Sequence, residues 1–297
     1  MTQQRLRGVI AAIATACDDR YDIDLSRSLK LARFLLENGC DGLNVLGTTG
    51  EATSFSLSQR QRLMSAYKSD GMPLNRLMVG TGAASVSDAI SLTQHAADLG
   101  FAGALVLPPF YYKGVPDEGL EAYIAAIVGA TSDRPIPIYL YHFPGMSAVP
   151  WKLELIQKLR ASHGARIAGL KDSSGDMPYA RAATGIEDFD VFPSNEAVLI
   201  EARNGAFAGC ISATAQLSPD LCGRAWQTGD QDALDKAVTI RKLFDGKPLV
   251  SGIKSLLAHI HGDPAWAQPM PPLGLYPAHD RTLAAAGHDA VRSAKVA

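Results

Sequence analysis

Lys171 is the residue whose type and setting most directly suggest chemistry in this sequence. It follows the apolar run of residues 167–170 and precedes a polar turn, Asp-Ser-Ser-Gly-Asp, at residues 172–176. A short apolar run closed by such a turn predicts a buried strand that enters a loop, with Lys171 at the rim of the sheet. Burial disfavours the charged form of an amine, and a neutral amine can attack a ketone and form a Schiff base. The alternative is a lysine with a buried stem whose charged amine reaches solvent beside Asp172.

A second candidate is the turn Gly-Thr-Thr-Gly-Glu, which begins at Gly47 and follows another apolar run. A turn of this composition exposes consecutive backbone N–H groups together with the hydroxyls of Thr48 and Thr49. These groups can bind a small carboxylate. A tight turn before a helix has the same composition, so the sequence leaves both interpretations open.

Two tyrosines are candidates for proton transfer. Tyr141 ends an apolar run, and a phenol in that place can relay protons to and from a substrate hydroxyl. The alternative is a packed ring whose hydroxyl meets water. Tyr111 lies in a loop rich in proline and aromatic residues, where loop or subunit packing is as good an interpretation as catalysis.

The elements that would position these residues are eight short apolar runs that alternate with amphipathic stretches. Strand–helix alternation implies parallel strands joined by right-handed crossovers, and eight such units predict an α/β fold, the (β/α)8 TIM barrel. Beyond residue 212 the pattern is helical, so we expect a barrel in residues 1–215 and a C-terminal helical region, residues 216–297, packed on it. The eight predicted strands are residues 9–15, 42–46, 77–80, 102–107, 137–141, 166–170, 189–192 and 208–212.

In barrels of this kind the active site lies at the carboxyl ends of the strands. The candidate residues all follow or end a predicted strand, so we expect them to converge on one mouth. Tyr141 and Lys171 end consecutive strands and should face each other.

Composition restricts the classes of function. The chain has 297 residues, 47% of them hydrophobic, and a net charge of −2 without a basic stripe, which argues against nucleic acid or an acidic membrane as a partner. The four cysteines form no Cys-x-x-Cys pair and the seven histidines do not cluster in sequence, so we expect no metal and a reduced, cytoplasmic protein. The apolar residues 9–16 resemble a short signal peptide but are better interpreted as the first strand.

Three motifs give the chain a resemblance to a known family. The Gly47 turn, Tyr-His-Phe-Pro from Tyr141 and Gly-Leu-Lys-Asp-Ser-Ser-Gly around Lys171 resemble the signatures of the dihydrodipicolinate synthase/N-acetylneuraminate lyase family. The resemblance runs from about residue 8 to residue 273 and includes Gly-Cys-Ile-Ser at residues 209–212. It implies a class I aldolase or lyase that handles pyruvate through a Schiff base, needs no cofactor and forms a homodimer or homotetramer.

The resemblance also implies residue roles. Lys171 would form the imine with the keto carbon of pyruvate, and Tyr141 would shuttle protons. Thr48 and Thr49 would bind the pyruvate carboxylate, and Thr48 would link Tyr141 to Tyr111 of a neighbouring subunit. Ile211 would contribute its backbone near the carboxylate.

Other positions depart from the family pattern and concern the rest of the substrate. Met146 stands where the synthase carries an arginine that binds the second substrate's carboxylate, and methionine cannot replace that clamp. The lyase's Asp-Glu pair for a sugar tail is here Asn195-Glu196. Ser173, Asn195 and Glu196 remain candidates for binding the hydroxyls of a shorter tail, or else they cap and support neighbouring loops.

We therefore expect cleavage or formation of a C–C bond between pyruvate and an aldehyde, in a 2-keto-3-deoxy sugar acid or a 4-hydroxy-2-oxo acid. Within this family the chain would be closer to the 2-keto-3-deoxy acid aldolases than to true dihydrodipicolinate synthase. Dehydration or deamination of a 2-keto acid through the same imine is the alternative, and synthase activity is disfavoured by Met146. A catalytically idle barrel that senses a keto acid is a further alternative, disfavoured because Lys171, Tyr141 and Thr48 are all present.

Overall fold

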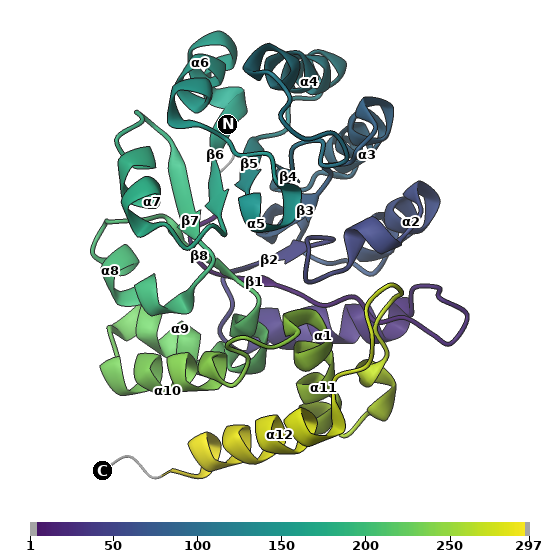
Figure 1. Cartoon of the computed structure of the whole chain (residues 1–297), viewed down its shortest axis with the longest axis vertical. Coiled ribbons are helices and arrows are strands. Elements are labelled where there is room, and N and C mark those ends of the chain that lie inside the picture. Colours follow the sequence, from purple (N-terminus) through teal and green to yellow (C-terminus); the bar gives the residue numbers. More distant parts are fainter. Residues whose placement is uncertain (1–4, 295–297) are drawn as a thin grey trace.

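Eight parallel strands form the centre of the computed structural model, which describes residues 5–294 (Figure 1). The strands are joined side by side in the order β7-β6-β5-β4-β3-β2-β1-β8. Across the remaining seam between β7 and β8, the Ala208 backbone N–H donates to the Val191 carbonyl at 3.0 Å. The sheet is thus a nearly closed TIM barrel, which confirms the predicted fold. The strands are Gly8–Ala12 (β1), Gly42–Val45 (β2), Leu77–Gly80 (β3), Gly103–Val106 (β4), Ile138–His142 (β5), Ile167–Asp172 (β6), Asp190–Pro193 (β7) and Gly209–Ser212 (β8).

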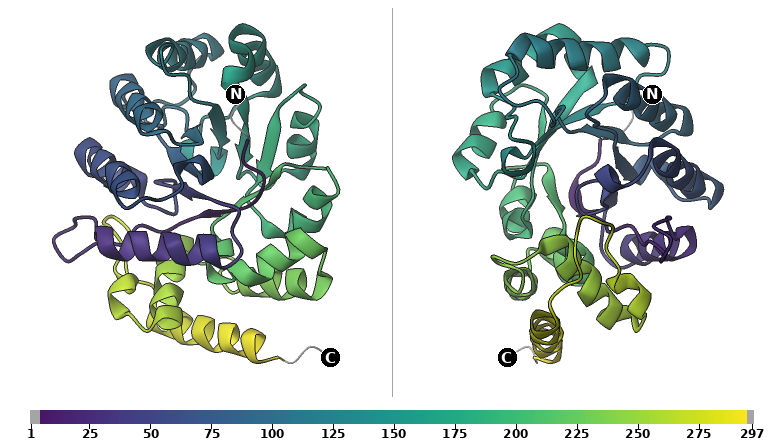
Figure 2. Two further views of the ribbon diagram at one scale, coloured as in Figure 1. Left: turned by 180° about the vertical axis from the view of Figure 1, so that it is seen from behind. Right: turned by 45° about the vertical axis from the view of Figure 1, so that its right-hand side comes forward.

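Helices surround the strands, and α11 and α12 lie together on one side of the barrel (Figures 1 and 2). The helices are Leu25–Glu37 (α1), Leu57–Ser69 (α2), Val86–Leu99 (α3), Asp117–Ala130 (α4), Pro144–Ser147 (α5), Leu153–His163 (α6), Met177–Ala183 (α7), Leu199–Arg203 (α8), Pro219–Thr228 (α9), Gln231–Lys242 (α10), Leu249–His261 (α11) and Ala278–Ser293 (α12). Local signals start several of them: Ser56 and Gln59 form a reciprocal capping box at α2, and Asp24 caps α1. None of the described helices is both long and apolar enough to cross a bilayer.

The apolar interior has two parts. Side chains between the strands and the helices form the larger core, whereas a smaller cluster that includes Ile10, Met78, Tyr139 and Phe192 fills the inside of the barrel. This second cluster comes from alternate positions of the strands, because successive side chains of a strand point to opposite faces. The filled interior leaves the carboxyl ends of the strands as the open end.

Two details of the predicted strands were wrong. The first apolar run continues to residue 15, but β1 ends at Ala12: Ile13 still donates to the Asn44 carbonyl of β2, whereas the Ala14 amide donates to the Gln216 side chain. Lys171 lies inside β6, one residue before its end, where the sequence placed it at the rim. The division into a barrel and a C-terminal region at residue 215 stays a prediction.

Gly80 tests how tightly β3 supports the turn that follows β2. A Cβ atom at Gly80 would lie 2.0 Å from the carbonyl oxygen of Leu46, the residue before the Gly47 turn. We expect Gly80→Ala to lower the free energy of unfolding by roughly 1–3 kcal/mol, the usual cost of overpacking, in urea denaturation. The matched control is Gly129→Ala in α4, where a Cβ meets no atom within 4 Å and should stabilise the helix by about 1 kcal/mol. Equal stability of the two variants would contradict this account.

Candidate active site

Lys171 and Tyr141 lie directly opposite each other on β6 and β5. Both side chains are buried, and the Lys171 amine lies 4.4 Å from the centre of the Tyr141 ring. No carboxylate among the described residues forms an ion pair with Lys171, and Asp172 instead accepts a hydrogen bond from the Ser174 backbone N–H at 2.9 Å. The alternative from the sequence was an amine that reaches solvent beside Asp172, whereas the Lys171 side chain is buried and faces Tyr141.

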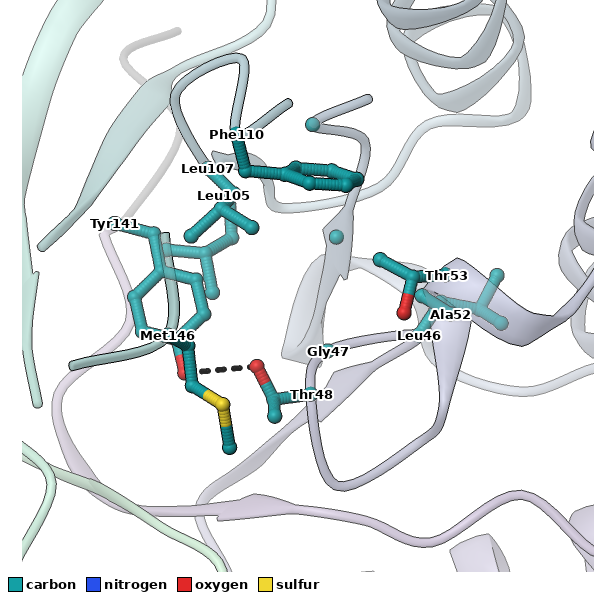
Figure 3. Close-up of a pocket in the computed structure, with 12 residues that line it drawn as sticks. Leu46, Gly47, Thr48, Ala52, Thr53, Leu105, Leu107, Phe110, Tyr141 and Met146 are labelled. Atoms are coloured by element: carbon teal, nitrogen blue, oxygen red, sulfur yellow. Dashed lines mark hydrogen bonds between the residues drawn. The ribbon is translucent and has the colours of Figure 1, made fainter. Parts of the chain in front are cut away.

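Thr48 connects the turn after β2 with Tyr141. Its hydroxyl oxygen lies 3.1 Å from the Tyr141 hydroxyl oxygen, within hydrogen-bond distance (Figure 3). A phenol held in this way can pass a proton to or from the threonine hydroxyl. Thr49, the next residue, is buried and faces the same cavity as Lys171.

Two adjoining cavities meet at Thr48 and Tyr141. The larger, of about 310 Å³, contains the Lys171 side chain and is also lined by Thr49, Ser173 and Ile211. The smaller, of about 180 Å³, is mostly apolar and is lined by Gly47, Phe110 and residues at the ends of β2 to β4 (Figure 3). Met146 borders both cavities and is 63% exposed, so this position presents an uncharged side chain to the site.

Glu51, the last residue of the Gly47 turn, connects this turn to the C-terminal part of the chain. Its carboxylate forms an ion pair with Lys254 of α11 and accepts a hydrogen bond from the Met270 backbone N–H at 2.6 Å. Lys254 also donates to the Gln268 carbonyl at 3.0 Å. Both charged side chains are fully buried, so each depends on the other. Sequence reasoning missed this pair, since nothing in the motif points to a lysine about 200 residues away.

His142 and Asp172 are the last residues of β5 and β6 and pair with each other next to Tyr141 and Lys171. Burial lowers the pKa of His142, whose ring stacks on Tyr179 at 4.3 Å and accepts the Trp151 backbone N–H at Nδ1. Burial raises the pKa of Asp172. At neutral pH the imidazole is therefore neutral, and it fixes the loop after β5.

The predicted pair Asn195-Glu196 has other partners. The Asn195 side chain caps the following turn by accepting the Ala197 backbone N–H at 3.0 Å. Glu196 is fully buried and accepts hydrogen bonds from Ser212 and Thr214, each at 2.6 Å. Neither residue is part of the lining of the Lys171 cavity, and substrate binding by them stays a prediction.

Arg241 is the charged residue of the cavity that sequence reasoning missed. It lies on α10, forms an ion pair with Glu196 at 3.1 Å and lines the same cavity as Lys171. The sequence shows only an amphipathic helix with a basic end, and that pattern does not tell an arginine directed into a cavity from one directed into solvent.

Tyr111 does not join the site of its own chain. Its ring is 75% exposed and packs edge-on against Tyr112 at 5.3 Å. The prediction that Tyr111 acts in a neighbouring subunit agrees with this position but is not tested by a single chain.

Two histidines that lie far apart in sequence come together in the structure. His259 and His288, on α11 and α12, lie with Asp289 so that possible metal-ligand atoms are within 4.8 Å of one another. Asp289 bonds both imidazoles, at 2.9 Å and 3.3 Å, and these contacts account for the grouping without a metal.

The profile of the Dihydrodipicolinate synthetase family matches residues 5–277. The chain belongs to this family. A relative from Chloroflexus aurantiacus, named an uncharacterized DapA-like lyase, is 33% identical over 251 residues, 84% of this chain and 83% of that protein. A 4-hydroxy-tetrahydrodipicolinate synthase from Pelagibacter ubique is 32% identical over 204 residues, 68% of this chain and 67% of the relative.

Solved structures agree with the assignment. Dihydrodipicolinate synthase from Agrobacterium tumefaciens superposes with a TM-score of 0.89 at 27% identity, covering 96% of this chain and 99% of that one. CdNal from Clostridium difficile, solved with mannosamine, gives a TM-score of 0.85 at 18% identity over 97% of this chain and all of its own, which shows the common fold. Membership places the protein among the pyruvate-dependent lyases, so the prediction of an enzyme of this class is confirmed.

The Glu51–Lys254 pair yields a test of how the Gly47 turn is held. We expect Lys254→Met to lower the free energy of unfolding by roughly 3–5 kcal/mol, because it leaves a buried carboxylate without its partner. The double variant Glu51→Gln/Lys254→Met removes both charges and should recover most of that loss in urea denaturation. If Lys254→Met were as stable as the wild type, the pair would not anchor the turn.

Proposed function

We propose that the protein is a Schiff-base lyase that cleaves or forms a C–C bond between pyruvate and an aldehyde. The substrate class is a 2-keto-3-deoxy sugar acid or a 4-hydroxy-2-oxo acid. The observation that carries the proposal is a buried lysine that forms no ion pair with any residue of 5–294 and lies beside a tyrosine hydrogen-bonded to a threonine. An amine that forms no ion pair can act as a nucleophile, and the phenol beside it can move the protons that the reaction requires.

The cleavage follows from these groups. The Lys171 amine attacks the keto carbon of the substrate, and loss of water gives a protonated imine. Tyr141 takes the proton of the C4 hydroxyl, the C3–C4 bond breaks, and its electron pair moves toward the imine nitrogen, which gives an enamine and a free aldehyde. Protonation at C3 and hydrolysis then release pyruvate and restore the amine. The imine is the electron sink, so the scheme needs no further cofactor.

The substrate carboxylate would bind at the turn after β2. Thr49 and Ile211 line the cavity with Lys171, and Thr48 faces both this cavity and Tyr141. Backbone N–H groups and hydroxyls in such a turn hold a carboxylate without placing a second cation beside the imine. Gly47 and Ser173 complete the set of proposed binding residues.

We also propose that the protein acts as a homodimer or homotetramer in the cytoplasm. The exposed Tyr111 ring supports this assembly, as does the apolar cavity of about 180 Å³ beside Thr48 and Tyr141. Tyr111 of a second copy would enter that cavity and reach the Thr48 hydroxyl. The four cysteines are free and buried, which is compatible with a reducing compartment.

The same imine can also eliminate water or ammonia from a 2-keto acid. This alternative uses Lys171 and Tyr141 equally well and differs in its product. A screen of 2-keto-3-deoxy acids with detection of free pyruvate decides between them, since only C–C cleavage releases pyruvate.

Lys171 makes the proposal testable. With pyruvate and borohydride we expect a reduced three-carbon adduct on Lys171, located by mass spectrometry of peptides. Tyr141→Phe should keep the adduct while turnover falls by roughly 10²- to 10⁴-fold, the usual contribution of a positioned proton donor. A folded protein that gives no adduct at Lys171 would refute the mechanism.

Met146 tests the synthase alternative, which the names of several relatives favour. We expect the wild type to condense pyruvate with aspartate semialdehyde poorly. Met146→Arg should raise kcat/KM for that aldehyde about tenfold, by adding a charged partner for its carboxylate. Met146→Leu is the neutral control. A wild-type kcat/KM in the ordinary enzyme range, above about 10⁴ M⁻¹s⁻¹, would show that synthase activity does not need the arginine.

A further inference from the structure

Only one nitrogen of the Arg241 guanidinium is hydrogen-bonded to the described residues of the protein. Its Nη1 lies within hydrogen-bond distance of four acceptors: Glu196 Oε2 and Thr214 Oγ1 at 3.1 Å, the Ser194 carbonyl at 3.3 Å and Ser212 Oγ at 3.4 Å. All four lie at the carboxyl ends of β7 and β8. Nε and Nη2 have no hydrogen-bond partner among residues 5–294. A guanidinium has five N–H donors in one plane, so a second edge remains available.

The side chain of Arg241 that carries this free guanidinium edge lines the cavity that contains Lys171. The Arg241 side chain is 27% exposed and lines the cavity together with Lys171. These two are the only charged side chains in the lining, within the part of the chain that the structure describes. The pyruvate carboxylate is assigned to the turn after β2, so the free edge of the Arg241 guanidinium is left for a second anionic group of the substrate, and no carboxylate lines the cavity within residues 5–294 to occupy that edge.

Glu196 holds the guanidinium in place. Its buried carboxylate takes hydrogen bonds from Ser212 and Thr214 as well as from Arg241, so it fixes Arg241 and has little capacity left for substrate hydroxyls. An arginine anchored at one nitrogen loses less freedom when its other edge binds a ligand, and bidentate binding of a carboxylate suits that edge.

The three groups occupy different sectors of the barrel mouth. The carboxylate turn follows β2, Lys171 lies on β6, and Arg241 stands over β7 and β8. The Ser194 backbone N–H donates to the Asp172 carbonyl at 2.9 Å, so the carbonyl that Arg241 contacts lies one strand from Lys171. A substrate whose pyruvate end reaches from the turn to Lys171 would direct its remaining atoms toward Arg241.

We propose, resting on the lyase function above, that the substrate carries a second carboxylate at the end remote from the keto group, and that Arg241 binds it. The substrate would be a 4-hydroxy-2-oxo dicarboxylic acid, and the aldehyde released on cleavage of its C3–C4 bond would itself carry the second carboxylate. Arg241 thus supplies, from α10, a cation that Met146 does not supply from α5. No carboxylate of residues 5–294 lines the cavity to receive an ammonium group, so an aldehyde acid without an amine fits best.

The test compares two aldehydes of equal length in the condensation with pyruvate: succinic semialdehyde, which ends in a carboxylate, and butyraldehyde, which ends in a methyl group. The quantity measured is the ratio of their kcat/KM values. We expect the wild type to prefer the acid, and Arg241→Lys to reduce the ratio roughly 10- to 100-fold, mainly through KM for the acid. Arg241→Lys keeps a cation beside Glu196 but loses the planar fork.

Two further variants separate recognition from folding. Glu196→Gln/Arg241→Met removes both charges and leaves no buried carboxylate unpaired. Its kcat/KM ratio of succinic semialdehyde to butyraldehyde should fall to about one, because the variant no longer distinguishes a carboxylate from a methyl group. Arg224→Lys, at an exposed ion pair with Asp230, is the matched control and should keep the wild-type ratio. An unchanged ratio in Arg241→Lys and in the double variant would show that Arg241 is only the counterion of Glu196.

The two proposals fail in distinguishable ways. If wild-type protein forms the borohydride adduct at Lys171 with pyruvate but uses both aldehydes equally, the lyase function stands and the second carboxylate is refuted. If no adduct forms, both are refuted.

Discussion

The register between β5 and β6 is the constraint on which the site depends. Tyr139 pairs with Gly169 and Tyr141 with Lys171, so two successive rows of side chains point into the barrel. In the lower row Gly169 leaves the space that the Tyr139 ring fills, because a Cβ there would lie 2.8 Å from the ring. Tyr139 packs against Phe192, the β7 residue that pairs with Lys171, with 6.0 Å between the ring centres, and the two rings help to fill the barrel interior. The upper row is therefore exposed only toward the mouth, and a shift of one residue would turn Lys171 to the outside.

The helices after β8 complete the site and do not merely cover the barrel. Two loops at the mouth each carry a buried glutamate, Glu51 and Glu196, and each is paired with a cation of the C-terminal region. A buried carboxylate is costly unless it is paired, so these contacts fix the loops. The two pairs differ in the cation. Lys254 is fully enclosed, whereas Arg241 keeps part of its guanidinium at the cavity surface.

Much of the site could be predicted from sequence because its chemistry lies at strand ends. The apolar runs predicted eight strands, and the motifs located Lys171, Tyr141 and Thr48, which the structure brings together. Contacts made across long stretches of chain were not predictable. Lys254 and Arg241 lie on amphipathic helices whose periodicity reports which face is buried, but not which loop a long side chain reaches. Tyr111 shows a different limit, since a sequence does not state whether a loop serves its own chain or a second copy.

The groups proposed for catalysis and the groups proposed for recognition stand on different kinds of element. Lys171 and Tyr141 stand on neighbouring strands whose hydrogen-bonded ladder fixes their separation, as imine chemistry requires. The groups proposed to select the aldehyde, Met146 and Arg241, lie on the short helix α5 and on α10, outside that ladder. A change at either position alters the charge of the cavity wall without moving the lysine. An uncharged residue at position 146 therefore does not imply a neutral substrate. Arg241 on α10 can supply a cation from the other side of the cavity.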